Sequence, residues 1–341
     1  MTTKSVGIVG ISGYSGKTAL EILLRHPEVR LSYVSANNTK GKLDDIWPEF
    51  KGRTDLTCEP FNVSKAMDLC ELVILAVPHT VAMQLAPELL KAKIKVIDLS
   101  GDYRLKTSDA YKQWYGTDHI DSANLKKAVY GLPELYREDI KKAQLISNPG
   151  CYPTAAILGL APLISTQQDK ISSIAIDAKS GVSGAGRKAT LNFSFGEVNE
   201  NFKAYKILNH QHSPEIELYL SKLSSKGVSV HFVPHLLPIT RGILETIYVQ
   251  FNEKISLDTV TKLYQRFYKK EPFVRILENG QQPEIKNVTH TNFCDLGFSV
   301  SADGKMLVVV ATIDNLVKGA AGQAIQNMNL MLGIKEETAL L

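Results

Sequence analysis

The stretch VGIVGISGYSG, residues 6–16, decides the fold of this chain. Val6–Val9 has the continuous apolar character of a buried strand, and the pattern of an amphipathic helix follows over Gly16–Arg25. A glycine triplet alone would serve any turn, but between a strand and a helix it allows a phosphate to approach the helix N-terminus. The stretch therefore predicts a dinucleotide site, and its expected contact residues are Gly10, Ser12, Gly13, Tyr14, Ser15 and Gly16.

The same alternation of strand and helix continues through the first 150 residues. Strands joined by helices imply right-handed crossovers and a parallel, doubly wound sheet of the Rossmann type. We therefore expect an N-terminal α/β domain over residues 1–150 that binds the dinucleotide. The further strands are expected at Leu31–Ala36, Leu72–Val77, Lys95–Leu99 and Leu145–Ser147, with a helix at Val81–Leu90.

The pattern changes after Gly150. A helix is expected over 152–164, and strand patterns then dominate, which predicts an α+β catalytic domain over 151–313 with a mixed, largely antiparallel sheet. A length of 341 residues is suited to two such domains. The strands are expected at 173–178, 228–234, 243–251 and 305–312, and helices at 256–268 and 314–331, the last with Gly333 as its stop.

Composition excludes several classes of protein. The formal net charge is +4, and the basic residues are dispersed, so no nucleic-acid partner is expected. No apolar run is long enough to cross a bilayer, and no signal-peptide pattern is present, so we expect no membrane partner. The four cysteines lack metal-ligand spacing, which predicts no metal site and a reducing, cytoplasmic location, although their even number would also allow two disulfides.

The residues after the second strand favour NADP(H) over NAD. An acidic residue that would hold a ribose 2′-hydroxyl is missing there. Ser35 and Lys40 stand in its place and suit a 2′-phosphate, although Lys40 and Lys42 would also fit a plain solvated loop. Pro78 ends the third strand at the edge where α/β sheets bind ligands, so it is a further cofactor candidate.

The stretch SNPGCYPT, residues 147–154, supplies a candidate nucleophile. A strand ends in a Pro-Gly turn, and Cys151 stands where the next helix should begin. The positive end of a helix lowers the pKa of a thiol, and free backbone N–H groups there can hold an oxyanion. Cys151 would otherwise be a small buried apolar residue. Cys58, Cys70 and Cys294 lack this setting and are interpreted as structural.

Eight motifs are spread over nearly the whole length of the chain: GISGYSG at 10–16, IDLSGDYRL at 97–105, YGLPE at 130–134, SNPGCYPT at 147–154, SGVSGAGR at 180–187, HQHSPEI at 210–216, PHLLPITRG at 234–242 and NLVKGAAGQAIQNMN at 315–329. On these motifs the chain resembles the N-acetyl-γ-glutamyl-phosphate reductase family. Two departures accompany the resemblance. Gln211 stands where the family has arginine in its HRHxPEI motif, and the family pattern SADFRL reads SGDYRL at 100–105.

The resemblance implies NADPH-dependent reduction of N-acetyl-γ-glutamyl phosphate to N-acetylglutamate semialdehyde, with release of phosphate. It also implies a homo-oligomer, a dimer or tetramer, and a C-terminal segment over 314–341 that returns to the cofactor domain. The family's catalytic histidine corresponds to His212. His210 would orient or contact the substrate, facing the same way as His212 if their segment is extended. Either histidine would otherwise be a satisfied core or surface residue.

The remaining site residues are expected to bind substrate or cofactor. Arg104 can hold phosphate oxygens, although an ion pair with Asp102 is the alternative. Glu215 is expected beside the histidines, where it would fix an imidazole or simply begin a helix. Glycines between residues 181 and 186 suggest close approach to substrate or nicotinamide, or only a turn, and Arg241 is a weaker anion ligand. The expected substrate residues thus also include Ser180 and Arg187, and the expected cofactor residues include Gly181, Gly184 and Asn315.

Three other functions compete with this interpretation. A sister reductase of a carrier-bound aminoadipyl or glutamyl phosphate would share every catalytic motif. Aspartate-semialdehyde dehydrogenase is disfavoured by the sequences at 210–216 and 315–323. A non-catalytic NADP-binding module is opposed by the presence together of Cys151, His212 and Arg104.

Overall fold

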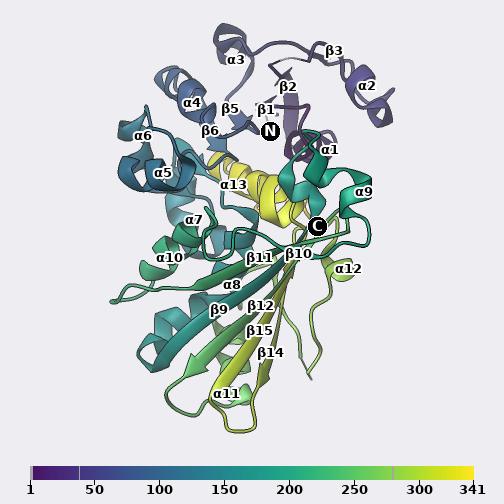
Figure 1. Ribbon diagram of the computed structural model, residues 1–341. Helices are drawn as coiled ribbons and strands as arrows, with labels where there is room; N and C mark the ends of the chain where they lie inside the picture. Colours follow the sequence, from purple (N-terminus) through teal and green to yellow (C-terminus); the bar gives the residue numbers. More distant parts are fainter. Residues whose placement is uncertain (1–2, 38, 279) are drawn as a thin grey trace. The chain divides into compact units, whose positions relative to one another are not determined.

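The structure is a computed structural model that describes residues 3–37, 39–278 and 280–341. It divides into two compact units. Figure 1 shows the chain coloured by residue number from the N-terminus to the C-terminus. Unit 1 comprises Met1–Pro149 with Ala320–Leu341, and unit 2 comprises Gly150–Gly319. Residues 314–319, which the sequence places in the C-terminal segment, lie in unit 2 because their hydrogen bonds are made there.

Unit 1 is built on a six-stranded sheet in which every pair of neighbours is parallel. The prediction of a parallel, doubly wound domain is therefore confirmed. Its third strand in space, Leu72–Leu75, is apolar and buried throughout, as expected for a parallel sheet covered on both faces. In spatial order the strands are β2 (Val29–Ser35), β1 (Lys4–Val9), β5 (Leu72–Leu75), β6 (Lys95–Asp98), β8 (Leu145–Ser147) and β7 (Val129–Tyr130).

The helices of unit 1 form two layers. α1 (Tyr14–Leu23), α7 (Pro133–Lys142) and α13 (Gly322–Leu332) pack together, and α3 (Val63–Leu69) and α4 (Ala82–Lys91) form another contacting pair. The second pair and nearby strands enclose one apolar core that includes Val73, Val96 and Tyr111. The smaller elements are β3 (Gly41–Lys42), α2 (Leu43–Ile46), η1 (Pro48–Phe50), β4 (Thr57–Cys58), α5 (Ser108–Tyr115) and α6 (Ser122–Lys127).

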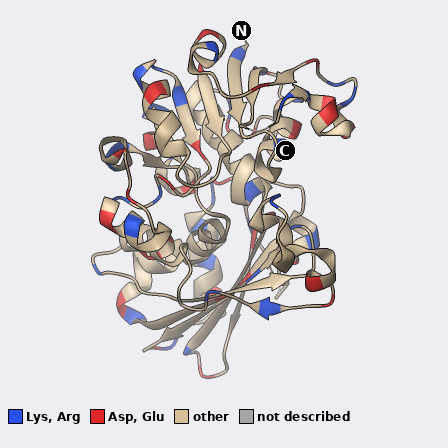
Figure 2. Cartoon of the chain, turned by 45° about the horizontal axis from the view of Figure 1, so that its top comes forward, with Lys and Arg blue, Asp and Glu red and all other residues tan. Residues whose placement is uncertain are grey.

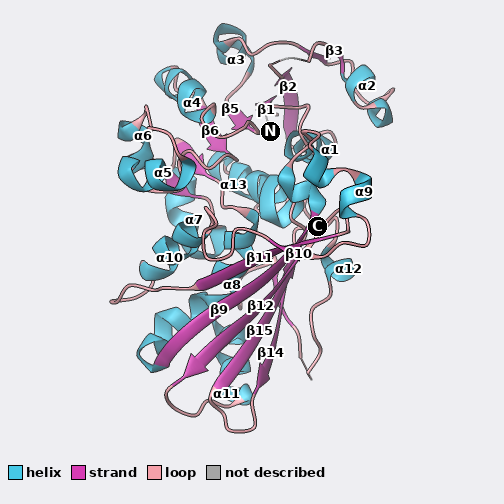
Figure 3. Cartoon of the chain, viewed as in Figure 1, coloured by secondary structure: helices cyan, strands magenta, loops and turns pink. Residues whose placement is uncertain are grey.

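Unit 2 contains a seven-stranded mixed sheet, drawn as the magenta fan in Figure 3. Four of its six neighbouring pairs are antiparallel, which confirms the predicted mixed, largely antiparallel arrangement. In spatial order the strands are β10 (Lys203–Ala204), β11 (His231–Leu237), β9 (Ile171–Gly181), β12 (Ile243–Phe251), β15 (Met306–Ile313), β14 (Cys294–Val300) and β13 (Val274–Ile276).

One buried helix, α8 (Cys151–Gln167), is the centre of unit 2. Residues 152–164 are all buried, as expected for a helix that is apolar on every side. α8 packs on β9, β12, β14 and β15 and contacts α10 (Ser213–Ser221) and α11 (Leu257–Phe267). Gly159 allows the close approach, because a Cβ there would lie 2.8 Å from Ile247 Cδ1. The remaining short elements are η2 (Gln168–Lys170), η3 (Val182–Ala185), η4 (Leu191–Phe193), α9 (Phe195–Val198) and α12 (Ile285–Val288).

The last predicted helix, residues 314–331, is two elements in the structure. A π-helical turn, η5 (Val317–Ala321), precedes α13, and Gly333 ends α13 in the left-handed conformation, as predicted. The polar side chains of α13 are buried but hydrogen-bonded. Gln323 and Asn327 donate to the Gly131 carbonyl, and Asn329 bonds His26 at 3.0 Å. These bonds explain how a helix rich in amide side chains lies inside unit 1.

Charged residues of both signs alternate over both units, as Figure 2 shows. The blue and red segments in the figure are scattered, which agrees with the dispersed charge of the sequence. Within the described ranges, every helix is too short or too polar to cross a bilayer.

Candidate active site

The glycine loop of unit 1 has room only for glycine at two positions. Gly10 has φ +97°, and a Cβ there would lie 2.1 Å from the Ala76 carbonyl oxygen. A Cβ on Gly16 would lie 2.3 Å from the Gly10 carbonyl oxygen. These contacts bring the loop close to the carboxyl ends of β1 and β5, which is where parallel sheets bind nucleotides.

Helix α1 begins without a side-chain cap or an acidic residue in its first turn. Gly13 is its N-cap residue, and Ser12, Tyr14 and Ser15 are partly exposed beside it. An uncapped helix N-terminus next to a glycine turn has backbone N–H groups for a pyrophosphate. The residues present therefore fit the phosphates of NADP(H).

The end of β2 is tied to this loop. The Ser35 carbonyl accepts hydrogen bonds from Gly10 N at 2.7 Å and Ile11 N at 3.1 Å. The Ser35 side chain is buried, whereas Lys40 and Lys42 are exposed. Asn38, in the same stretch, lies outside the described residues. Lys40 and Lys42 follow a strand whose end is hydrogen-bonded to the glycine loop. Exposed cations in this position fit the 2′-phosphate of NADP(H).

The third strand ends in exposed residues, as expected for a ligand edge. Pro78 and His79 follow β5 and are both exposed. His79 Nδ1 accepts a hydrogen bond from Gly101 N at 2.8 Å, so the ring proton of the neutral imidazole is on Nε2. The ring also packs edge-on against Tyr115. These two contacts orient the His79 ring. Pro78 remains exposed at the same edge of the sheet.

Arg104 makes backbone contacts that neither of the two expectations named. Its guanidinium is almost fully buried, with Nε donating to the Asn148 carbonyl at 3.0 Å and Nη2 to the Leu99 carbonyl at 2.8 Å. Asp102, the proposed ion-pair partner, accepts from the N–H groups of Thr80 and Met83, at the start of α4. Arg104 therefore holds together the ends of β6 and β8, whatever else it binds.

In unit 2, Cys151 is the first residue of α8, as the Pro-Gly turn predicts. Gly150 is the N-cap and supplies no side chain, so the start of α8 is open. The Gly150 N–H donates to Glu215 Oε1 at 2.8 Å, and the Glu215 side chain is fully buried. Cys151 itself is partly exposed, whereas the other three cysteines are buried, and all four are free thiols. Glu215 thus fixes the turn that leads into Cys151.

The histidine pair lies in a turn rather than in the extended segment that the sequence suggested. Ser213 N donates to the His210 carbonyl, and His212 N donates to His210 Nδ1 at 3.1 Å. The two rings nevertheless approach to 4.7 Å between centroids. Burial, followed by the charge of Lys206, lowers the pKa of His210 to about 4. His210 is therefore neutral near pH 7, with its proton on Nε2.

Two tyrosines complete this group, and the sequence analysis missed both. The Tyr152 and Tyr205 hydroxyls lie 3.3 Å apart, and the Tyr152 ring packs edge-on against His212 at 5.8 Å. Burial raises the pKa of Tyr205 to about 12, and a negative charge on Cys151 acts in the same direction. The Tyr152 hydroxyl also donates to the His235 carbonyl at 3.2 Å, and burial raises the pKa of Tyr152, so both phenols are neutral near pH 7. The position of Tyr152 beside Cys151 was the only signal in the sequence.

The residues between 180 and 187 differ in burial and in the groups that they contact. Ser180 is buried, and its hydroxyl donates to the Gly181 carbonyl. A Cβ on Gly181 would lie 2.8 Å from the Thr240 carbonyl carbon, whereas Gly184 has its closest such contact, at 3.2 Å, with Ser180 Oγ. Arg187 is exposed. Gly181 therefore serves close packing between two backbone segments.

Asn315 has its side chain engaged within unit 2. Its Oδ1 accepts from Gly242 N at 2.7 Å, and its Nδ2 donates to Ser183 Oγ at 2.9 Å. One N–H of the amide remains after these two bonds. The residue thus orders the turns at 183 and 242, which border the start of β12.

Comparison with protein families agrees with this two-unit architecture. Residues 5–143 match the family model described as "Semialdehyde dehydrogenase, NAD binding domain". Residues 151–315 match the model "Semialdehyde dehydrogenase, dimerisation domain". Together the two models cover nearly the whole chain.

Curated relatives match at full length. The N-acetyl-gamma-glutamyl-phosphate reductase of Desulforamulus reducens is 45% identical over 336 residues, covering 98% of this chain and 97% of that protein. The protein of the same name from Desulfotalea psychrophila is 47% identical over 337 residues, with the same coverage.

Solved structures share the fold at low identity. Aspartate semialdehyde dehydrogenase with NADP from Candida albicans aligns with a TM-score of 0.73 and 14% identity, covering 97% of this chain and 99% of that one. Aspartate semialdehyde dehydrogenase II from Vibrio cholerae, complexed with ASA, gives 0.73 and 16%, covering 98% and 99%.

Proposed function

Because the chain belongs to the N-acetyl-γ-glutamyl-phosphate reductase family, we propose that Cys151 is the nucleophile with which it reduces N-acetyl-γ-glutamyl phosphate. The overall reaction converts the acyl phosphate, NADPH and a proton into N-acetylglutamate 5-semialdehyde, NADP⁺ and phosphate, a step of arginine biosynthesis. The observation that carries the role of Cys151 is its position as the first residue of α8, where it is partly exposed.

The Cys151 sulfur would attack the acyl carbon of the substrate. The helix N-terminus stabilises the thiolate, and the C–O bond to phosphate breaks as the C–S bond forms. The product of this step is a thioester on Cys151 and free phosphate. NADPH, when bound, supplies the hydride that reduces the thioester. The resulting thiohemiacetal oxyanion collapses to the aldehyde, and the C–S electron pair returns to sulfur as a thiolate, which takes up one proton from solvent to restore the thiol.

His212 is the proposed acid/base group. It would take the proton of the Cys151 thiol and pass it to the departing phosphate, so that no proton is lost or gained in the first half-reaction. His210 is unsuited to this role because burial lowers its pKa to about 4. Its Nδ1 instead accepts the His212 N–H, which fixes the backbone of the acid/base residue. His210 is therefore proposed as an orienting and substrate-contacting residue.

The other expected substrate residues remain part of the proposal. Glu215 would act through the Gly150 N–H, and Ser180 is buried beside the glycine-rich loop. Arg187 is exposed and lies outside any helix or strand. A side chain in this position can move toward an anionic substrate. Arg104 donates its Nε and Nη2 to carbonyls, and it remains a proposed phosphate ligand.

We also propose which residues bind NADP(H). The uncapped start of α1 and the glycine loop would hold the pyrophosphate, and Ser35 and Lys40 the 2′-phosphate side of the ribose. The remaining candidates are Pro78, Gly181, Gly184 and Asn315.

The chain carries a dimerisation domain, and we propose that the uncovered face of the unit 2 sheet forms the contact. Alternate residues of β12 point away from α8, and Tyr248 among them is exposed. Asp177, Lys179 and His235 bring both charge signs to this face, which suits a twofold interface. The nearby segment 191–208 exposes Leu191, Phe193, Phe195, Phe202, Ile207 and Leu208. We propose that the assembly is a homodimer or tetramer. The four cysteines are all outside disulfides, which favours a cytoplasmic location.

The reaction can be tested in reverse. Purified protein with N-acetylglutamate semialdehyde, NADP⁺ and phosphate should form NADPH in a phosphate-dependent way, whereas aspartate semialdehyde should give less than about 1% of that rate. Substituting NAD⁺ for NADP⁺ tests the cofactor, and free against carrier-linked acyl phosphate tests the substrate in the forward direction. Equal or greater rates with the aspartate or carrier-linked compound would refute the proposed substrate.

A further inference from the structure

Gly319 lies directly against Cys151. A Cβ on Gly319 would lie 2.9 Å from the Cys151 Cβ and 3.3 Å from its Cα. Real Cβ atoms essentially never approach another atom to less than 3.0 Å. Gly319 does not adopt a positive φ, so its lack of a side chain is required by the neighbouring cysteine and not by its own backbone.

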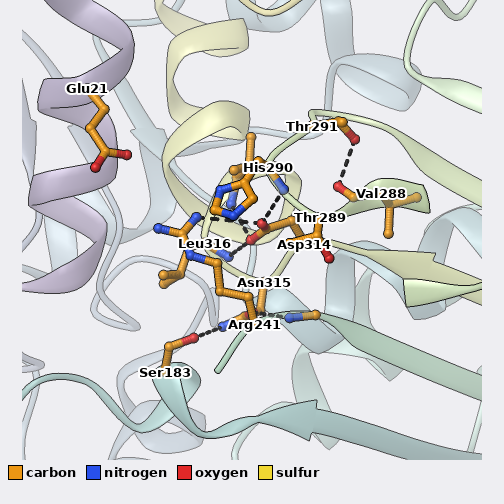
Figure 4. Close-up of polar contacts among 12 residues, drawn as sticks. Glu21, Ser183, Arg241, Val288, Thr289, His290, Thr291, Asp314, Asn315 and Leu316 are labelled. Carbon is orange, nitrogen blue, oxygen red and sulfur yellow. Dashed lines mark hydrogen bonds and ion pairs between the residues drawn. The ribbon is translucent and has the colours of Figure 1, made fainter. Parts of the chain in front are cut away.

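The turn that carries Gly319 is held by Asp314, whose carboxylate is fully buried. Oδ1 accepts from Leu316 N at 2.7 Å and from Val317 N at 3.2 Å, and the Asp314 carbonyl accepts from Gly319 N at 2.9 Å. Figure 4 shows Asp314 together with Asn315 and Leu316 of this turn. The aspartate therefore closes the turn on itself between residues 314 and 319.

Contacts with other segments of unit 2 hold the same turn from outside. Asp314 Oδ2 accepts from His290 N at 2.7 Å and lies 3.6 Å from Arg241 Nη1 (Figure 4). Asn315 bonds Gly242 N and Ser183 Oγ. Lys318 is fully buried, with its ammonium 5.6 Å from the centre of the Phe273 ring. A turn anchored at 314, 315 and 318 cannot move away from Cys151 without breaking several buried contacts.

We propose that Gly319 is a positioning residue for Cys151. The anchored turn 314–319 packs against the Cα and Cβ of the nucleophile and thereby determines the position of its sulfur at the start of α8. A methyl group at 319 would displace the cysteine, because both backbones are anchored. A misplacement of about 1 Å at a reacting atom can lower a rate by about 10²-fold. The inference rests on the proposed role of Cys151 as nucleophile.

The first test compares Gly319→Ala with Gly227→Ala, a glycine of unit 2 whose Cβ would meet nothing within 4 Å. Gly319→Ala should lower kcat about 100-fold and change the pH profile of Cys151 alkylation by iodoacetamide, with NADPH binding unchanged. Gly227→Ala should match the wild type in all three. A Gly319→Ala enzyme with kcat within twofold of wild type and an unaltered alkylation profile would overturn the proposal.

A second test uses stability alone and therefore does not depend on activity. Cys151→Gly removes the Cβ that Gly319→Ala would meet, so the two substitutions form a double-mutant cycle. Gly319→Ala should lower the Tm in the wild-type background and do so much less in the Cys151→Gly background. If Gly319→Ala alone does not fold, the double variant should. Equal losses in both backgrounds, or failure of both to fold, would refute the contact, whereas failure of the proposed chemistry would leave this cycle intact.

Discussion

The N–H of Gly150 donates to the carboxylate of Glu215 at 2.8 Å, so a residue of α10 holds the turn that leads into Cys151. Glu215 is only three residues after His212 in sequence. The acid/base candidate and the support of the nucleophile's turn thus come from one short segment. This arrangement links the position of Cys151 to the start of α10, and it explains why a carboxylate is fully buried here.

Glu215→Ala should lower kcat about 10- to 100-fold, because the Gly150 N–H loses its acceptor and the turn before Cys151 loosens. Glu215→Gln should retain most of the activity, since its amide oxygen can accept the same bond. Steady-state kinetics with parallel NADPH titration would measure both. Equal activity of the two variants would show that the hydrogen bond does not matter to catalysis.

Tyr205→Phe should lower kcat/KM about tenfold, because the hydroxyl contact with Tyr152, the residue that follows Cys151, is lost. Tyr268→Phe is the matched control, since its buried hydroxyl donates to the Leu158 carbonyl. That control should lower stability but leave kcat/KM within about twofold. If both variants lose activity equally, the effect of Tyr205 is structural and not local to the site.

Arg104→Lys should lower both activity and the free energy of unfolding. A lysine cannot donate to the Leu99 and Asn148 carbonyls together with the geometry of a guanidinium, and each buried carbonyl left without a donor costs about 1–3 kcal/mol. Urea unfolding and phosphate KM in the reverse reaction would be measured side by side. A variant with wild-type stability and a raised phosphate KM would make Arg104 a ligand without a structural role.

Glu245 predicts a pH dependence of stability. Burial raises its pKa well above the usual value, with Lys179 opposing, and neither carboxyl oxygen has a hydrogen-bond partner among the described residues. The folded state thus holds a proton that the unfolded state releases above its ordinary pKa near 4.5. The stability contribution is complete below that pH and falls by about 1.4 kcal/mol per unit as pH rises toward the folded pKa.

Glu245→Gln should therefore raise the Tm at pH 8 and have little effect at pH 4. Glu253→Gln, at an exposed ion pair with Lys170, is the control and should show no comparable trend. Thermal unfolding at a series of pH values would measure both. A constant difference between wild type and Glu245→Gln across the series would contradict the raised pKa.

Features that depend on residues close together in the sequence could be predicted from it. The glycine loop and the turn before Cys151 were predictable, because glycine, proline and a following helical pattern leave few conformations. Strand β12 was predicted at its observed bounds, Ile243–Phe251, from its alternating and β-branched residues.

Contacts between distant residues were not predictable. Arg104 meets the Asn148 carbonyl because β6 and β8 are neighbours, with Asp98 opposite Ser147, and no pattern near residue 104 indicates this. Tyr205 reaches Tyr152 across 53 positions. The helix expected over 314–331 begins later, with a π-helical turn at Val317. Asp314 accepts the N–H groups of Leu316 and Val317 before that turn, and helical periodicity does not record such buried hydrogen bonds.

The central claim is that Cys151 becomes acylated, and a single-turnover experiment without NADPH tests it most directly. Enzyme mixed with N-acetyl-γ-glutamyl phosphate should release about one equivalent of phosphate per chain, and mass spectrometry of the quenched protein should find the acyl group on the Cys151 peptide. Cys151→Ala should give neither signal while still binding NADPH. Release of phosphate by Cys151→Ala at the wild-type rate, or an acyl group on another residue, would contradict the account.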